Sequence, residues 1–267
     1  MSAVDVDGLR VAFTRTGDGP PVVLLGGFVG DRTATWRNQI EALSTSCTVV
    51  AWDAPGSGES ADVPESFRLP DYADCLAGLL SALTLEQPVL VGLSFGGALA
   101  LEFFRRHHSQ VRGLFLAGAY AGWAGSLPPD TVRQRLAASI QASRLPPDEF
   151  VSALLPSMFS DAAPKDRVVE FGASMAANFR PPGFRAMAFA SAEADLRDVL
   201  PLVDVPTVVL HGADDIRAPR DVAAALHAAI PASRLVVLPH VGHVSCVEAP
   251  EQFTAEVQAF LRGQQLL

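Results

Sequence analysis

The sequence predicts an α/β fold in which a mostly parallel β-sheet carries helices on both faces. Short runs of β-branched and aliphatic residues recur along the chain, and their near-continuous hydrophobicity is typical of strands buried on both faces of a parallel sheet. Between these runs lie segments with apolar residues three and four positions apart, which is the period of an amphipathic helix. Strands and helices that alternate in this way imply right-handed crossovers, with helices on both sides of the sheet.

Each element is predicted by its own run, and each strand run ends in turn residues before a helical pattern begins. In chain order, the first part of the chain gives strand "PVVLL" (21–25), helix "TWRNQIEALS" (35–44), strand "CTVVAW" (47–52), helix "DYADCLAGLLSAL" (71–83), strand "PVLVGL" (88–93), helix "GGALALEFFRRHH" (96–108) and strand "VRGLFLAG" (111–118). The last part gives strand "PTVVLHG" (206–212), helix "PRDVAAALHAAI" (219–230), strand "SRLVVLP" (233–239) and helix "PEQFTAEVQAFLRG" (250–263).

The alternation breaks between these two parts. Residues 120–205 contain proline pairs and helical fragments but no convincing strand. Because proline fits the first turn of a helix and breaks its interior, each pair is expected to open or close a helix. No flexible linker flanks the segment, which disfavours a separate domain. We therefore expect residues 1–119 and 206–267 to form the core, and residues 120–205 to form a helical cap insertion over one end of the sheet.

Composition narrows the class of protein. The chain has 267 residues, of which 49% are hydrophobic and 18% charged, and this suits a single well-filled α/β domain with an insertion. A formal net charge of −9 argues against nucleic acid or an anionic membrane as partner. The N-terminus lacks the apolar region of a secretory signal, and no apolar run is long enough to span a bilayer. Three cysteines without Cys-x-x-Cys spacing suggest neither disulfides nor zinc, so we expect a cytoplasmic protein.

The segment "GLSFGG" (92–97) carries the strongest chemical signal, because it stands where a predicted strand becomes a helix. A serine hydroxyl needs a base within reach to act as a nucleophile, and its attack creates an oxyanion that needs N–H donors. A sharp turn there lifts the Ser94 side chain clear of the sheet and presents the Phe95 N–H at a helix N-terminus. Such a turn is crowded, which explains the flanking Gly92, Gly96 and Gly97. A simple N-cap role for Ser94 is the alternative, but a cap does not need three glycines.

A base and its orienting acid are expected later in the chain, with the acid first. Both candidates follow predicted strands, and sites in open α/β sheets gather at the carboxyl ends of the strands. His243 is the expected base, with Nε2 facing the serine and Nδ1–H facing the acid. His240 and His211 are the alternatives. His240 is expected to be a loop residue, and His211 to lie at the end of a buried strand. Asp214 and Asp215 compete as the acid, because adjacent loop side chains diverge and only one can point at His243.

With these motifs the chain resembles the α/β-hydrolase superfamily over nearly its whole length. "GLSFGG" is similar to the nucleophile elbow of that family, "GADD" to its Gly-x-x-Asp pattern after the sixth strand, and "GHVSCVEAPEQF" to its Gly-His segment. "WDAPGSGES" resembles a family turn that shapes a loop and is not catalytic. The resemblance implies an α/β-hydrolase fold, a catalytic triad of Ser94, Asp215 and His243, and no metal or organic cofactor.

The resemblance also implies which amides bind the oxyanion. The N–H of Phe95 would be one donor, and the N–H of Phe28, in the loop after strand 21–25, would be the other. One departure affects this loop, because family members usually carry His-Gly there and this chain has Gly26 in place of the histidine. The serine at the elbow excludes relatives that attack with an aspartate, such as dehalogenases and epoxide hydrolases.

The expected activity is hydrolysis of carboxylic esters or lactones with a small to medium apolar acyl group, through an acyl-enzyme. Cofactor-free haloperoxidase or perhydrolase chemistry and carbon–carbon bond hydrolysis are alternatives within the same fold. A small-molecule receptor with slow turnover is a third possibility. The expected partner is a small-molecule substrate, without nucleic acid or membrane, and the sequence does not indicate an oligomeric state.

Large apolar side chains in the insertion suggest which residues contact the substrate. Core packing is the default role for each, but those that face Ser94 would favour an apolar acyl group. An anionic substrate would need an arginine over the pocket, and Arg180, Arg185 and Arg217 are available. The expected substrate-binding residues are Trp123, Met158, Phe159, Phe179, Phe184, Met187 and Val244.

Overall fold

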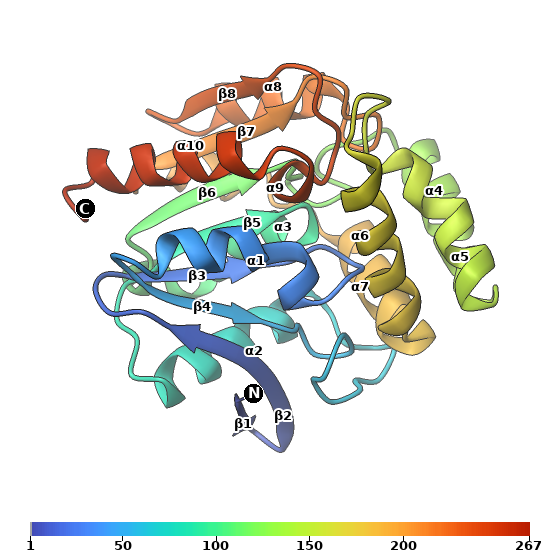
Figure 1. Cartoon of the computed structure of the whole chain (residues 1–267), viewed down its shortest axis with the longest axis horizontal. Coiled ribbons are helices and arrows are strands. Elements are labelled where there is room, and N and C mark those ends of the chain that lie inside the picture. The colour runs from blue at the N-terminus through green and yellow to red at the C-terminus, as the bar shows by residue number, and fades with distance from the viewer. Residues whose placement is uncertain (1) are drawn as a thin grey trace.

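A single eight-stranded sheet runs through the centre of the computed structural model, which describes residues 2–267 (Figure 1). The strand order is β1-β2-β4-β3-β5-β6-β7-β8, and every pairing beyond β4 is parallel. This confirms the predicted α/β class. The strands are β1 (Ser2–Val6), β2 (Leu9–Thr16), β3 (Pro21–Leu25), β4 (Thr48–Trp52), β5 (Val89–Leu93), β6 (Gly113–Ala117), β7 (Thr207–Gly212) and β8 (Arg234–Leu238).

The two N-terminal strands were not among the predicted elements. β1 and β2 form an antiparallel hairpin at the sheet edge, and β2 pairs antiparallel with β4. Asp7 and Gly8 connect the strands, and both have positive φ, at 50° and 85°. This is the turn that suits a two-residue hairpin, and Asp-Gly is one of its typical sequences. Most of β1 is exposed, so it lacks the continuous apolar run that marks the buried strands.

Helices cover both faces of the sheet. α1 (Arg32–Leu43) and α10 (Pro250–Gly263) lie on one face, in front in Figure 1, and α2 (Leu69–Ala82), α3 (Phe95–His107) and α8 (Arg220–Ala229) lie on the other. Alternate residues of β3 divide between them, because Val22 and Leu24 pack with α1 and α10 while Val23 and Leu25 pack with α2 and α3. Burying each such side chain contributes roughly 1.5–3 kcal/mol, so the sheet is a rigid base for the strand ends.

Four helices lie between β6 and β7, at the end of the sheet toward which the parallel strands run (Figure 1). Each of the three proline pairs in this segment, at 128–129, 146–147 and 181–182, supplies the first residue of a helix, namely α4 (Pro129–Ala142), α5 (Pro147–Leu154) and α7 (Pro181–Glu193). α6 (Lys165–Ala177) was not predicted. Its buried face includes Gly172, where a Cβ would come 2.9 Å from Leu155, so this glycine lets the segments pack closely. The division into core and cap at residues 120 and 205 stays a prediction.

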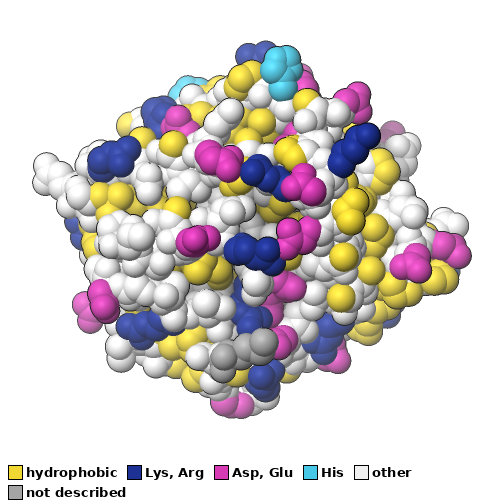
Figure 2. Space-filling model, in the orientation of Figure 1, with side chains coloured by type: hydrophobic (Ala, Val, Ile, Leu, Met, Phe, Trp, Pro, Cys, Tyr) yellow, Lys and Arg dark blue, Asp and Glu magenta, His cyan; other side chains and the backbone are white. Residues whose placement is uncertain are grey.

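Shorter elements complete the chain: the 3₁₀ turns η1 (His108–Gln110), η2 (Leu155–Ser157) and η3 (Leu200–Leu202), and the short helix α9 (Ser245–Glu248). Within residues 2–267, no helix is both long enough and apolar enough to cross a bilayer. On the face shown in Figure 2, acidic and basic side chains are interspersed. Such a mixed surface does not concentrate positive charge on this face.

Candidate active site

Ser94 occupies a strained turn between β5 and α3. β5 ends at Leu93 and α3 begins at Phe95, so the serine is the single residue that joins them. Its φ of 55° and ψ of −111° lie in a region that residues with a side chain rarely adopt. The Ser94 N–H donates to the Ala117 carbonyl of β6 at 2.8 Å, which ties the turn to the neighbouring strand. The backbone therefore projects the serine side chain away from the sheet.

Close backbone approach explains the three glycines around Ser94. A Cβ on Gly96 would come 2.1 Å from the Leu25 carbonyl oxygen, and one on Gly92 would come 2.3 Å from the Gly96 carbonyl oxygen. A Cβ on Gly97 would come 2.4 Å from the Cβ of Ala119. A Cβ atom does not come this close to a non-bonded atom in real proteins, so a side chain at any of these positions would displace the turn. An N-cap role would not require this crowding.

His243 and Asp215 form a buried pair. The His243 Nδ1 lies 2.7 Å from the Asp215 Oδ2, and both side chains are almost fully buried. The other Asp215 oxygen accepts backbone N–H bonds from Arg217 and Ala218 at 2.8 and 2.9 Å. Burial acts to raise the pKa of Asp215, but the charge and hydrogen bond of His243 and the N–H bond from Ala218 outweigh it and hold the pKa below its usual value. Asp215 is therefore an ionised acceptor for the Nδ1–H of His243.

The competing candidates lie elsewhere. Asp214 is exposed, and the carboxylate of Asp214 lies 3.9 Å from the ring of His240, which is itself exposed. His211 is buried at the end of β7, and neither of its ring nitrogens has a hydrogen-bond partner within residues 2–267. Burial lowers the pKa of His211, so it is a neutral residue behind the site. Of the acids and imidazoles after β7, only Asp215 and His243 pair at hydrogen-bond distance in the described chain.

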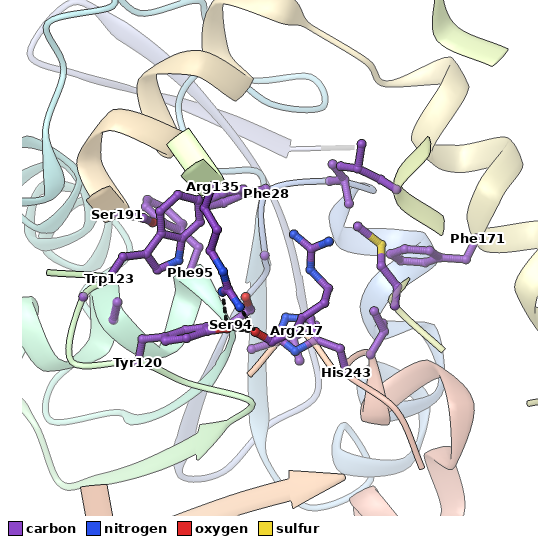
Figure 3. Close-up of a pocket in the computed structure, with 18 residues that line it drawn as sticks. Phe28, Ser94, Phe95, Tyr120, Trp123, Arg135, Phe171, Ser191, Arg217 and His243 are labelled. Carbon is purple, nitrogen blue, oxygen red and sulfur yellow. Dashed lines mark hydrogen bonds between the residues drawn. The ribbon is translucent and has the colours of Figure 1, made fainter. Parts of the chain in front are cut away.

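Ser94 and His243 line the same cavity, and Figure 3 shows both side chains at the same end of it. Gly118, at the end of β6, has a φ of 52°, and a Cβ there would come 3.1 Å from the His243 Nδ1. This glycine lets the imidazole pass close over the strand. The Ser94 hydroxyl makes no hydrogen bond within residues 2–267. Catalytic hydrogen bonds often tighten only when substrate binds.

A second carboxylate supports the loop that carries His243. The buried side chain of Glu248 accepts the N–H of Gly242 at 2.9 Å. It also accepts hydrogen bonds from the backbone N–H and the hydroxyl of Ser160, in the segment between α5 and α6. Glu248 therefore joins the loop before His243 to the helical segment between β6 and β7.

The two amides expected to bind an oxyanion lie beside Ser94. Phe28 and Phe95 both line the cavity, and a Cβ on Gly27 would come 3.7 Å from the Cβ of Ser94. Neither backbone N–H of Phe28 or Phe95 donates a hydrogen bond to another described residue, so both donors remain available. Gly26 leaves space where a histidine is usual, because a Cβ there would meet only Trp36, at 3.8 Å. The oxyanion-binding role of both amides stays a prediction.

The cavity that contains Ser94, hereafter the inner cavity, has a volume of about 40 Å³. Of the seven expected substrate-binding residues, Trp123, Met158 and Val244 line it. The other four lie outside its lining because they pack against protein. Phe159 lies edge-on to Phe171, Phe179 stacks on Phe150, Phe184 packs edge-on against Phe28 and Phe150, and Met187 is fully buried in the core beside α2 and α3.

Several residues that line the inner cavity were not predicted from the sequence. Tyr120 follows the carboxyl end of β6, and sites in open α/β sheets gather at the carboxyl ends of the strands. The same rule drew attention to the loop of Asp215, so the sequence also contained a signal for Tyr120. Arg135 and Ser191 lie on helices, and no pattern in the sequence indicates which way they point. Of the three arginines considered for an anionic substrate, only Arg217 lines the inner cavity; Arg180 and Arg185 pair with Asp62 and Glu65 instead.

Comparison with known proteins agrees with this architecture. The model of a family described as alpha/beta hydrolase fold matches residues 20–250. Among curated relatives, the 2-hydroxy-6-oxo-2,4-heptadienoate hydrolase of Pseudomonas putida is 31% identical, and the match covers 96% of this chain and 94% of that protein.

Solved structures show the same likeness. A thermophilic esterase from Thermogutta terrifontis matches with a TM-score of 0.90 and 30% identity, covering 99% of both chains. The enol-lactonase from Burkholderia xenovorans matches with a TM-score of 0.89, covering 98% of this chain and 100% of that one. At 24% identity, this second likeness shows the shared fold alone.

Proposed function

The chain belongs to the alpha/beta hydrolase family, and from that premise we propose that it hydrolyses carboxylic esters or lactones through Ser94, His243 and Asp215. The observation that carries the proposal is the strained Ser94 turn in one cavity with the buried His243–Asp215 pair. A serine, an imidazole and an ionised carboxylate in this order are the groups that nucleophilic acyl transfer requires.

In the first half of the reaction, His243 Nε2 takes the proton of the Ser94 hydroxyl as its oxygen attacks the substrate carbonyl. The Asp215 carboxylate accepts the Nδ1–H, fixes the orientation of the ring and stabilises its cationic form. Negative charge develops on the carbonyl oxygen, toward which the N–H groups of Phe28 and Phe95 point as donors. His243 then gives its proton to the leaving alcohol, and an ester of Ser94 remains.

In the second half, water replaces the alcohol. His243 takes a proton from water, the hydroxide attacks the acyl carbonyl, and the same two amides bind the second oxyanion. His243 returns the proton to Ser94 as the free acid leaves. In a lactone, alcohol and acyl group belong to one ring, so the product is a single hydroxy acid.

The walls of the inner cavity favour a small acyl group. The apolar surface of the cavity and its volume of about 40 Å³ limit the part of the substrate that lies beside Ser94 to a small apolar group. The apolar side chains are those of Phe28, Trp123, Met158, Phe171 and Val244. Apolar walls with a few placed polar groups are typical of small-molecule sites. The proposed substrate class is therefore small to medium esters and lactones.

Carbon–carbon bond hydrolysis is the second candidate. It is supported by the Pseudomonas putida relative, whose name specifies 2-hydroxy-6-oxo-2,4-heptadienoate as its substrate and which is 31% identical to this chain. The same serine and histidine would serve that reaction, so the two candidates are distinguished by their substrates.

A substrate panel tests the proposal. 4-Nitrophenyl esters from acetate to dodecanoate, several aliphatic lactones and 2-hydroxy-6-oxo-2,4-heptadienoate would be assayed under identical conditions. We expect kcat/KM to be highest for the short acyl esters or the lactones and to fall as the acyl chain outgrows the cavity. The measurement is the initial rate over a range of concentrations for each substrate.

Two results would decide against ester and lactone hydrolysis. One is a rate on every ester and lactone no higher than that of the Ser94→Ala variant. The other is a kcat/KM on the dienoate that exceeds those of all esters and lactones, which would favour the second candidate.

A further inference from the structure

Two arginines extend into the pocket that contains Ser94 and His243 (Figure 3). Arg135 comes from α4 and Arg217 from the loop after β7, two residues beyond Asp215. Neither forms an ion pair with a carboxylate in the described part of the chain. Neighbouring arginines do, since Arg133 pairs with Asp130 and Arg180 with Asp62. The other arginines without an ion pair are exposed to solvent, so within residues 2–267 only Arg135 and Arg217 combine partial burial with the absence of a counter-charge.

The side chain of Arg135 is held in the wall of the inner cavity by hydrogen bonds to the protein. Its two terminal nitrogens donate to the Tyr120 hydroxyl at 2.9 Å and to the Arg217 carbonyl at 2.7 Å. Its guanidinium also lies 5.7 Å from the centre of the Tyr120 ring, and the Tyr120 hydroxyl donates to the same Arg217 carbonyl. Arg135 and Tyr120 thus hold the backbone of Arg217 in place.

Arg217 keeps most of its own donors free. One terminal nitrogen donates to the Ser157 hydroxyl at 2.8 Å, and this is its only side-chain hydrogen bond within residues 2–267. The nearby Asp215 carboxylate is already occupied by His243 and two backbone amides. Burial lowers the pKa of Arg217, yet a guanidinium stays charged in proteins. A half-buried cation without a counter-charge is costly, and an anionic ligand would relieve that cost.

The arginines stand where two cavities meet. An outer cavity of about 350 Å³ is lined by residues of α4 and α5 and by Ile216. It shares four residues with the inner cavity, namely Trp123, Arg135, Leu154 and Arg217. A molecule that reaches Ser94 from the outer cavity would pass these side chains. The guanidinium of Arg217 can then hold one end of the substrate while the other end lies at Ser94.

We propose that the substrate of the proposed hydrolysis carries a carboxylate, which Arg217 binds at the junction of the two cavities. This inference rests on the proposed function and narrows its substrate class to esters or lactones with an acid group away from the scissile bond. A carboxylate fits better than a phosphate, because the open edge of one guanidinium matches two coplanar oxygens. Arg135 does not add a second open guanidinium, because both of its terminal nitrogens already donate to protein oxygens.

Two matched pairs of substrates test the inference. Monomethyl adipate and dimethyl adipate differ in a carboxylate on the acyl side, and 4-acetoxybutanoate and its methyl ester differ in a carboxylate on the alcohol side. Methanol or acetate release gives kcat/KM for each. We expect the wild type to prefer the anionic member of at least one pair, and Arg217→Gln to lower that preference about 10- to 100-fold, as for the loss of a charge-assisted hydrogen bond.

Two further variants control for indirect effects. Arg217→Lys keeps the charge without the planar fork and should retain part of the preference. Arg220→Gln removes an exposed charge from the same region and should change the preference by no more than about twofold, because solvent and salt screen it.

The inference is overturned if the neutral members are hydrolysed as well as the anionic ones. It is also overturned if Arg217→Gln lowers kcat/KM by the same factor for both members of each pair. The proposed function fails differently, because then the wild type hydrolyses none of the four substrates faster than Ser94→Ala.

Discussion

Replacing Ser94 with alanine is expected to lower kcat for ester hydrolysis by about four to six orders of magnitude. The alanine has no oxygen to form the acyl-enzyme, so only direct attack by water, assisted by the oxyanion-binding amides, would remain. The fold should survive, since the hydroxyl makes no hydrogen bond within residues 2–267. Initial rates on 4-nitrophenyl acetate and a thermal unfolding curve measure the two parts.

A matched control is available in Ser66, an exposed serine far along the chain from the elbow. Ser66→Ala should keep wild-type kcat and KM. If Ser94→Ala retained activity within about tenfold of the wild type, covalent catalysis at this residue would be ruled out, because loss of the nucleophile costs far more.

Replacing Asp215 with asparagine is expected to lower kcat by about four orders of magnitude. Asparagine is nearly the same size and can still receive the two backbone N–H bonds through its carbonyl oxygen. Its amide would instead face His243 Nδ1 as a donor, which favours the tautomer with the proton on Nε2. That tautomer cannot accept the proton of Ser94. The measurement is kcat on the best ester of the panel at neutral pH.

Asp214 gives the comparison for Asp215, because it is adjacent, has the same charge and is exposed. Asp214→Asn should leave kcat within about threefold of the wild type, since an exposed charge is screened by solvent. Equal losses in the two variants would show that removing negative charge from the loop, and not orientation of His243, accounts for the effect.

Local patterns made most of the fold predictable. The spacing of hydrophobic residues predicts the buried strands and the flanking helices. The structure places the predicted strands within about two residues of their predicted bounds. The β1–β2 hairpin and α6 lacked such signals. β1 is mostly exposed, and α6 fully buries only Phe171, Gly172 and Met175, so β1 has no continuous apolar run and α6 has only a narrow buried face.

Some residues of the candidate site were likewise predictable from local patterns, and others were not. Ser94 is marked by its glycines, which the backbone requires for steric reasons that any sequence with this turn must obey. The choice of Asp215 over Asp214 needed the family pattern, because spacing alone does not show which of two adjacent carboxylates turns inward. Arg135 and Met187 show the remaining limit. Whether a helical side chain faces a cavity or the core depends on how the helices pack, which the sequence does not state locally.

The mass of the protein after reaction with a fluorophosphonate tests the central proposal most directly. This probe reacts with a serine only when a neighbouring base activates it, so it reports Ser94 and His243 acting together. We predict a single adduct on the intact chain, located on Ser94 by peptide mapping and absent from Ser94→Ala. An unmodified chain that nevertheless hydrolyses esters, or an adduct on another residue that persists in Ser94→Ala, would contradict it.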